Sequence, residues 1–279
     1  MKFTKPSLNS NMRHWPLWVM AMHSALAFAQ STETQEVVVQ SGRLVQRQFD
    51  APASVYTIDG QSIRNSGAQV NFSDVLNQAP GVVALNRNNY AQDVQISVRG
   101  FGARSAFGLR GFRLITDGIP ATTPDGQGQA STVSLTSAER IEILTGPLAQ
   151  LYGNSAGGVI QVFTREAEKD PTLQSQIVTG SHGLSRTDWQ FSQRSGNVSF
   201  VGDYSTFNIN GYRANSEAKR EQLNSLLRIE VNPETRFKLI ANAFNMPYAK
   251  DPLGLTLAQL ALNPVPVSYT HLTLPTNRE

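Results

Sequence analysis

The second half of the chain alternates between apolar and polar residues, and this pattern predicts β-strands. Apolar side chains occur at every second position in several segments, which together predict about five strands: 174–180, 188–192, 197–206, 223–231 and 236–244. Two-faced strands of roughly ten residues, joined by polar turns, are typical of a membrane β-barrel whose apolar face contacts lipid. A soluble β-sandwich shows a similar alternation and stays open as an alternative.

The first half of the chain mixes short strands with short helices. Strands are expected at 54–58, 82–85, 95–99, 112–116 and 141–144. Asp59-Gly60 and Asp117-Gly118 are turn dipeptides, and the second predicts a hairpin with Ile119-Pro120. Asn71 could cap a helix over 72–78, and Thr136 with Glu139 could form a capping box. This mixture indicates one α+β domain.

The stretch 141–164, IEILTGPLAQLYGNSAGGVIQVFT, predicts a strand, a helix opened by Gly146-Pro147, a glycine turn and a second strand. Its residues 153–157 match the G-x-S-x-G pattern around Ser155. A hydrolase elbow has a strand before the serine and a helix after it, and here that order is reversed. His182 is the one histidine outside the two ends of the chain. We therefore expect no enzyme activity.

The N-terminus has the features of a secretory signal peptide. Residues 1–29 contain Lys2, Lys5 and Arg13, an apolar run from Trp15 to Phe28, and a small-residue site at 27–29. Without the three cations, 21 basic side chains remain against 21 acidic ones. The remaining chain is thus neutral, and its charge does not indicate nucleic-acid binding.

Cysteine is absent, so disulfides and thiolate metal sites are excluded. The chain also has no histidine pair and no P-loop lysine, so neither a metal site nor a cofactor site is expected. Any metal that the protein handles must therefore arrive already chelated.

A short β-branched run, Val37, Val38 and Val39, lies between Glu36 and Gln40 in an otherwise polar segment. Such a run could pair as an added strand with another protein. Equally, it could be the first strand of the following domain. At the other end, residues 267–279 continue no strand pattern, and we regard them as foreign to the preceding reading frame.

Three segments resemble, in order and spacing, the plug of TonB-dependent outer-membrane receptors. They are VLNQAPGV at 75–82, ISVRGFGARSAFGLRGFRLITDGIP at 96–120 and IEILTGPLAQLYGNSAGGVIQVFTR at 141–165. EVVVQSG at 36–42 is similar to the TonB box that precedes such plugs. The resemblance implies a signal peptide at 1–29, a flexible segment with the TonB box at 30–49, an α+β plug domain at 50–168 and antiparallel transmembrane β-barrel strands at 169–266.

The resemblance also implies a function. Family members take up a scarce solute across the outer membrane, and the TonB box, here Glu36, Val37, Val38, Val39 and Gln40, pairs with TonB. The expected solute is a ferric chelate, a siderophore or ferric citrate, and a small redox cofactor such as pyrroloquinoline quinone is the alternative. Outer-membrane lipid is the expected surrounding of the barrel strands.

Ligand contact is expected in the outward plug loops. The candidates are Tyr90, Arg104, Phe107, Arg110 and Asp125, because arginine and aromatic side chains bind anions and flat ligands. Arg99, inside the motif, is expected to pair with an acid of the barrel wall instead. A different class of function, a secreted binding or adhesion module with a β-sandwich, stays open.

The family barrel has about 22 strands around its plug, and the segment after 168 can hold only about five. The resemblance therefore implies that this sequence is an N-terminal fragment with an incomplete barrel. An open lipid-facing sheet edge leads us to expect a polypeptide that cannot transport solute by itself.

Overall fold

A five-stranded mixed sheet lies at the centre of the N-terminal part of the computed structural model, which describes residues 38–40, 46–51, 53–106, 108–153 and 155–265. The strand order is β3-β8-β9-β6-β7. The bounds are β3 (Ser54–Asp59), β6 (Arg113–Thr116), β7 (Ile119–Pro120), β8 (Ala138–Thr145) and β9 (Val159–Thr164). β6 runs parallel to β9, and the other neighbours are antiparallel. The hairpin at Asp117-Gly118 is confirmed, with both residues at positive φ.

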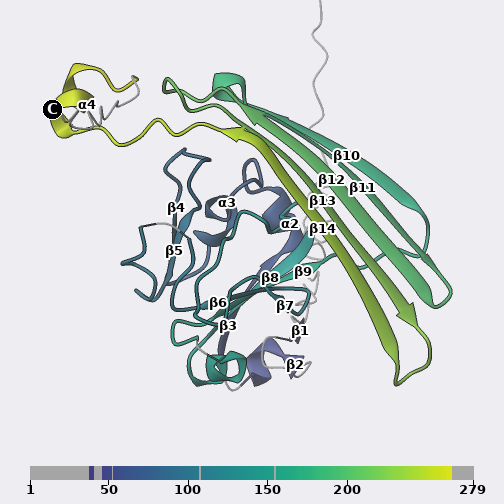
Figure 1. The fold of residues 1–279 in the computed structure, drawn as a ribbon. Helices are drawn as coiled ribbons and strands as arrows, with labels where there is room; N and C mark the ends of the chain where they lie inside the picture. Colours follow the sequence, from purple (N-terminus) through teal and green to yellow (C-terminus); the bar gives the residue numbers. More distant parts are fainter. Residues whose placement is uncertain (1–37, 41–45, 52, 107, 154, 266–279) are drawn as a thin grey trace, which may run out of the picture. The chain divides into compact units, whose positions relative to one another are not determined.

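Short elements surround this sheet (Figure 1). They are β1 (Val38–Val39), β2 (Gln46–Arg47), η1 (Gln48–Asp50), α2 (Gly60–Arg64), α3 (Ser73–Leu76), β4 (Val82–Leu85), β5 (Gln95–Val98) and η2 (Pro147–Tyr152). β4 pairs with β5, and β1 pairs with β2. The described residues belong to one compact unit that begins at Val38.

Apolar side chains cover both faces of the central sheet. The larger cluster joins Ile63 of α2 and Leu76 of α3 to Leu114 and Ile141 of the sheet. A smaller cluster on the other face contains Val39, Leu144 and Val159 among its members. A strand covered on both faces is buried at consecutive positions, as β8 is from Ile141 to Thr145 and β9 is from Val159 to Val162, although the paired residues Glu142 and Gln161 are polar.

The turn between η2 and β9 requires glycine. Gly158 has φ +130°, and a Cβ atom there would lie 2.6 Å from the carbonyl oxygen of Leu144. Only a residue without a side chain fits at this close approach. The predicted order of strand, helix, glycine turn and strand is thus confirmed, although the helix is of the 3₁₀ type.

Five long strands follow the domain expected at 50–168, here called the plug, and form one antiparallel sheet in sequence order, here called the wall, with its strands side by side in Figure 1. They are β10 (Thr172–Thr179), β11 (Ser185–Ser195), β12 (Val198–Ile209), β13 (Ala218–Glu230) and β14 (Arg236–Ala249). η3 (Ser181–Gly183) connects the first two, and α4 (Leu257–Leu262) follows the last. The five predicted strands are confirmed and are longer than predicted.

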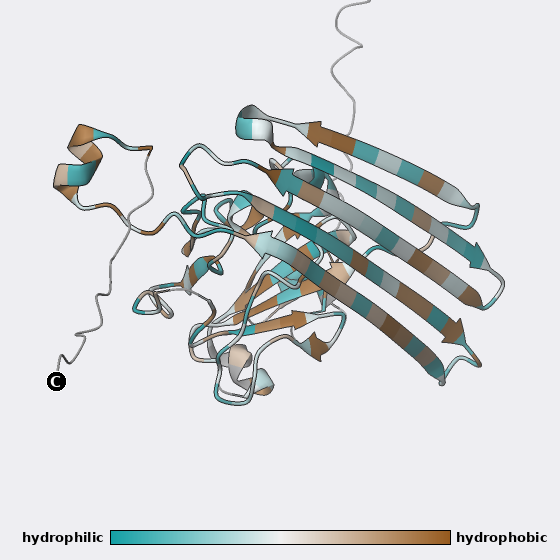
Figure 2. Cartoon of the chain, turned by 45° about the horizontal axis from the view of Figure 1, so that its top comes forward, coloured by the Kyte–Doolittle hydropathy of each residue, from teal (hydrophilic) through white to brown (hydrophobic). Residues whose placement is uncertain are grey.

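The two ends of this sheet differ. At one end, here called the loop end, residues 180–184 and 210–217 connect the strands, and the segment after Ala249 leaves the sheet. At the other end, here called the turn end, the connections are 196–197 and 231–235. Figure 2 shows the alternation of hydrophilic and hydrophobic residues along each strand.

The turn expected at Asp59-Gly60 and the cap expected at Asn71 are wrong, although the helix expected over 72–78 is present as the shorter α3. Asp59-Gly60 does not turn the chain back, because Asp59 caps α2 by accepting a hydrogen bond from the Ser62 N–H at 2.8 Å. Asn71 caps nothing, since the carboxylate of Asp74 accepts from the N–H groups of Val70 and Asn71.

The capping box expected at Thr136 and Glu139 is also wrong, because residues 138–145 form a strand instead of a helix. The Thr136 hydroxyl donates to Asp203 of β12 at 2.5 Å. Thr136 therefore makes a side-chain contact with the second sheet and does not cap a helix.

Within the described residues, no helix is long and apolar enough to cross a membrane. The signal peptide at 1–29, Glu36, Val37, Phe107 and the tail at 267–279 lie outside the described residues.

Candidate functional site

The sheet β10–β14 turns its polar face toward the plug. On this face lie side chains that are buried although they are polar or charged: Arg186, Asp188, Gln190, Ser192, Asp203, Arg220, Gln222 and Asn224. On the opposite face, apolar side chains are exposed, with Leu239 at 66% and Phe237 at 62%. A β-sandwich would bury the apolar face, so the described strands contradict that alternative.

Residues 132–137 of the plug, here called the docking segment, receive many of these polar contacts. Gln190 donates to the Thr136 carbonyl at 2.7 Å, and Gln222 donates to the Thr132 carbonyl at 2.7 Å. Asn224 donates to the Ser137 hydroxyl at 2.7 Å. Side chains of the wall thus form hydrogen bonds with polar groups of the plug, including its backbone carbonyls. The contact is therefore polar, and it fixes the alignment of the wall strands against the plug.

Two buried arginines connect the wall to a second part of the plug. Arg186 pairs with Asp188 at 2.8 Å and donates to Gln69. Arg220 donates to the Val70 carbonyl at 2.7 Å. Because both guanidinium groups are buried, they depend on these partners for the hydrogen bonds that water would otherwise supply.

At the loop end, Asp251 connects the segment after β14 to the plug. Its carboxylate accepts from Asn89 and from Gln92, both at 2.8 Å. A cavity of about 280 Å³ lies at this contact and is lined by residues of 87–92, 212–216 and 251–254. The plug loop 86–91 therefore lies beside the loops of the wall.

Of the predicted ligand contacts, Tyr90 lies at the wall. Its ring is 4.9 Å from that of Phe207, and both residues line a second cavity, of about 200 Å³. Burial raises the pKa of the Tyr90 phenol to about 12, with a smaller contribution from the negative charge of Asp74. Tyr90 thus packs as a neutral aromatic residue at the plug–wall contact.

The other described candidates do not converge on one cavity with Tyr90. Arg104 and Arg110 are exposed on the loop 100–111. Asp125 is exposed too, and the Thr123 hydroxyl, followed by the Gln127 N–H, lowers the pKa of its carboxyl group. Arg99 is exposed, and no wall carboxylate among the described residues pairs with it, so the structural pairing expected for it is not seen.

Sequence reasoning missed the residue that holds the loop 121–127. Arg113 of β6 donates to the Thr122 hydroxyl at 3.2 Å and to the Thr123 carbonyl at 2.5 Å. It also missed Asp93, which accepts from the N–H groups of Ala130 and Ser131. Desolvation raises the pKa of Asp93 above its usual value. Asp93 lies outside the quoted motifs, and Arg113 lies inside the segment 96–120, but its contact with the loop 121–127 is made across the fold and leaves no spacing signal along the chain.

The described part of the segment expected to bind TonB, residues 38–40, is docked on the plug. Val39 is fully buried in the smaller apolar cluster and pairs with Gln46, and Val38 is 43% exposed. The Gln40 N–H donates to the buried carboxylate of Glu142 at 2.9 Å, and Arg140 also pairs with Glu142, at 2.8 Å. Two interpretations of this run were open: a strand that pairs with another protein, or the first strand of the following domain. In this structure Val38 and Val39 form such a first strand.

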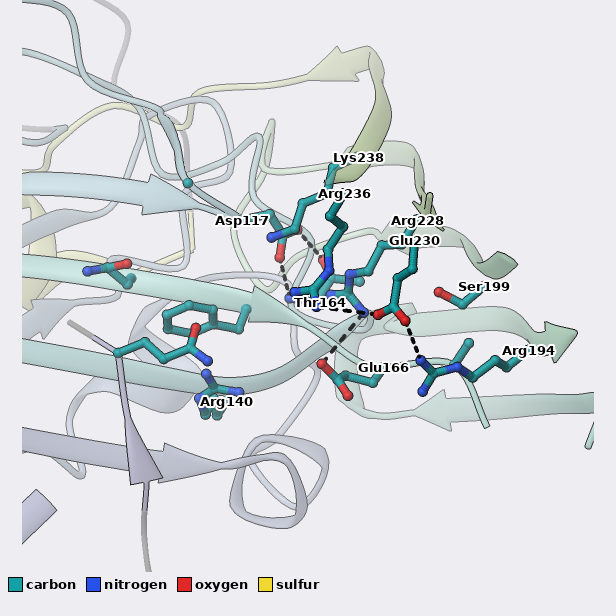
Figure 3. A pocket seen from close by; sticks show the side chains of 15 residues that line it. Asp117, Arg140, Thr164, Glu166, Arg194, Ser199, Arg228, Glu230, Arg236 and Lys238 are labelled. Carbon is teal, nitrogen blue, oxygen red and sulfur yellow. Dashed lines mark hydrogen bonds and ion pairs between the residues drawn. The ribbon is translucent and has the colours of Figure 1, made fainter. Parts of the chain in front are cut away.

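A cavity of about 430 Å³ lies beside Gln40 at the turn end (Figure 3). Plug residues such as Asp117, Arg140 and Thr164 line one side of it. The inner faces of β11, β12, β13 and β14 line the other. Its lining is strongly charged, with Arg194, Arg228, Glu230, Arg236 and Lys238 on the wall side.

Ser155 has a structural role. It is buried, and its hydroxyl donates to the carbonyl of Ala149 and, at 3.2 Å, to that of Gly153. His182 lies in the connection between β10 and β11, where its ring is 6.0 Å from that of Tyr212. The serine therefore holds the end of η2, and this geometry offers no support for nucleophilic catalysis.

Comparison with known proteins agrees with this geometry. Residues 47–159 match the family described as TonB-dependent Receptor Plug Domain. An iron-regulated outer membrane virulence protein of Vibrio cholerae is 32% identical over 163 residues, which are 57% of this chain and 24% of the relative. The vitamin B12 transporter BtuB of Vibrio vulnificus is 27% identical over 155 residues, 55% of this chain and 24% of the relative.

Among solved structures, the pyoverdine outer membrane receptor FpvA of Pseudomonas aeruginosa PAO1 shares the fold with a TM-score of 0.64 at 19% identity, covering 77% of this chain and 31% of the receptor. The chain spans about a quarter of the length of the curated relatives it matches. The plug match and the polar-inward sheet lead to one conclusion: residues 47–159 form a plug domain of the TonB-dependent receptor type, and five antiparallel strands follow it.

Proposed function

We propose that this chain contributes the plug and the first barrel strands of a receptor, and that this receptor mediates TonB-dependent uptake of a ferric chelate, a siderophore or ferric citrate, across the outer membrane, as a transporter and not as an enzyme. The observation that carries the proposal is the inverted sheet, whose polar face packs on the plug while its apolar face is exposed. An exposed apolar sheet face is stable where it contacts lipid and not water. The name of the Vibrio cholerae relative, an iron-regulated outer membrane virulence protein, supports an iron-containing solute.

The loop end is the proposed solute-facing side. Arg104 and Arg110 are exposed cations, and Tyr90 lies between the plug and the wall. Guanidinium groups bind carboxylate oxygens in a bidentate manner, which suits an anionic chelate. We retain Tyr90, Arg104, Phe107, Arg110 and Asp125 as proposed contacts, with Asp125 acting through the loop that it stabilises.

The turn end is the proposed TonB-facing side, with Glu36–Gln40 as the segment that binds TonB. Val38 and Val39 already have strand geometry, so their backbone groups could pair with a partner strand once Val39 leaves its apolar cluster. The substitution Val38→Pro removes a backbone N–H and should abolish uptake while solute binding remains. Val38→Thr keeps the β-branched shape and should transport normally.

Growth on single iron sources tests the proposed function. A strain that lacks the gene should fail to grow on one ferric chelate as the only iron source, and the intact gene should restore growth. Arg104→Ala together with Arg110→Ala should weaken binding of that chelate at normal surface expression. Unchanged growth of the deletion strain on every ferric chelate would contradict an iron solute.

A cofactor is the second candidate solute, because one relative is named a vitamin B12 transporter. The same deletion strain, tested for growth that depends on pyrroloquinoline quinone or another redox cofactor, separates the two. A defect confined to the cofactor condition would transfer the proposal from iron to that cofactor.

A further inference from the structure

The cavity at the turn end has more cationic than acidic groups. Five cationic side chains line it, together with three carboxylates. The cations are Arg140, Arg194, Arg228, Arg236 and Lys238, and the carboxylates are Asp117, Glu166 and Glu230. They come from the plug and from three strands of the wall, so the fold brings them together from distant parts of the sequence.

Arg140 is already paired with the buried carboxylate of Glu142 at 2.8 Å. The three lining carboxylates do not neutralise the other four cations one by one. Glu230 is shared, since Arg194 and Arg236 each lie 3.4 Å from it. Asp117 is occupied by the backbone N–H and the hydroxyl of Thr164, at 2.9 and 2.6 Å. The cavity therefore has donor groups in excess of its acceptors.

Two of the cations, Arg228 and Lys238, are available to bind an anion. Arg228 meets Glu166 only at 3.8 Å, and Glu166 is 77% exposed, so this pair is loose and solvated (Figure 3). Among the residues that the structure describes, no carboxylate lies within ion-pair distance of the Lys238 ammonium. Arg228 and Lys238 can thus accept a new anionic partner without breaking a strong contact.

We propose that this cavity is a transit site for a multiply charged carboxylate anion, on the side of the plug opposite to the solute-binding loops. The inference rests on the proposed function, because the anion is the chelate that the loop end binds first. The volume of about 430 Å³ falls in the range of small-molecule sites. An anion that passes the plug would meet these cations beside Gln40, next to the segment proposed to bind TonB.

Chemical protection of Lys238 tests the site directly, with citrate as the probe. In the purified receptor, acetylation of Lys238 by an amine-reactive ester is followed by mass spectrometry. Citrate at twice its dissociation constant should slow the modification about threefold, since protection scales with one plus the ratio of ligand to Kd. Lys219, on the outward face of the adjacent strand and paired with Glu221 at 3.0 Å, is the matched control and should be unaffected.

Sodium chloride at the same ionic strength separates binding from charge screening. Equal protection by chloride, protection of Lys219 as well, or no protection of Lys238 would each overturn the proposal. Arg228→Gln should reduce the protection of Lys238, and Arg228→Lys should restore part of it. If the variant protein unfolds, the wild-type comparison of Lys238 with Lys219 still decides.

Transport separates this inference from the proposed function. Lys238→Gln should leave chelate binding to non-energised cells unchanged and should lower uptake in energised cells several-fold, whereas Lys219→Gln should transport normally. Normal uptake by Lys238→Gln would contradict a transit site even if the receptor transports iron. Absence of any chelate binding by the wild type would instead contradict the proposed function, without affecting the citrate result.

Discussion

The plug and the sheet β10–β14 bury opposite kinds of side chains. The plug sheet has apolar residues on both faces, as in a water-soluble domain. The second sheet buries arginine, aspartate and glutamine against the plug and exposes leucine and phenylalanine on its other face. Alternation of apolar and polar residues is therefore enough to predict the strands. Whether the apolar or the polar face of the sheet is buried depends on what surrounds that sheet.

Removing an apolar side chain from the plug core should have the largest effect on stability. Phe112 is fully buried, so Phe112→Ala loses its burial and leaves a cavity, and the free energy of unfolding should fall by about 4 kcal/mol. Urea titration of the purified protein measures this. Phe237→Ala on the exposed face is the control, and an equal loss there would contradict the difference between the two regions.

Removing a charge from the inner face of the wall should have the second-largest effect on the free energy of unfolding. Arg186→Ala leaves Asp188 buried without its ion pair, and the expected loss is about 3 kcal/mol. The exposed pair of Lys250 and Glu217, at 2.9 Å, provides the comparison, because Lys250→Ala should cost at most about 1 kcal/mol. Similar losses for both would show that the inner face is solvated in solution.

Placing a charge on the outer, apolar face of the wall tests in a bilayer whether this face contacts lipid. Leu239→Arg should lower the stability of the receptor in phospholipid vesicles by about 2 kcal/mol, because a cation is costly on the lipid side of a membrane strand. Lys238→Arg, one position away on the polar face, should be neutral. Folding yields and urea titrations in vesicles measure both, and a neutral Leu239→Arg would argue against lipid contact.

The pH dependence of plug stability should divide its carboxylates into two kinds. The Ser62 N–H lowers the pKa of Asp59, so its contribution is present above pH 3.8 and is lost as the pH falls through its folded-state pKa. Desolvation raises the pKa of Asp93, so its contribution falls as the pH rises from 3.8 through its folded-state pKa. Urea titrations across pH, with Asp59→Asn and Asp93→Asn, should remove slopes of opposite sign. Slopes of the same sign would refute this assignment.

The strands were predictable from sequence because each follows from local chemistry. Alternation predicted β10–β14, and Asp117-Gly118 predicted the turn between β6 and β7. The helix starts were not predictable in the same way. Thr136 fits a helix cap by spacing, but its hydroxyl is bound to Asp203, 67 residues later in the sequence.

The candidate sites were less predictable than the fold. The sequence could place a TonB-box-like segment, but not the burial of Val39, which depends on a cluster made with residues of β3, β6, β8, η2 and β9. It could not assemble the cavity of Arg228 and Lys238 with Arg140, because these residues meet only when the wall packs against the plug. A site formed between two sheets combines residues that are far apart in the sequence, so no local motif predicts it.

Fluorescence of Trp189 tests most directly that the apolar face of β10–β14 contacts lipid. Trp189 is 45% exposed, stacks on Tyr204 at 5.9 Å, and is the only tryptophan after residue 29. In vesicles, with Trp15 and Trp18 replaced by phenylalanine, lipids brominated on their acyl chains should quench Trp189, and aqueous iodide should not. Quenching by iodide without quenching by brominated lipid would contradict the account.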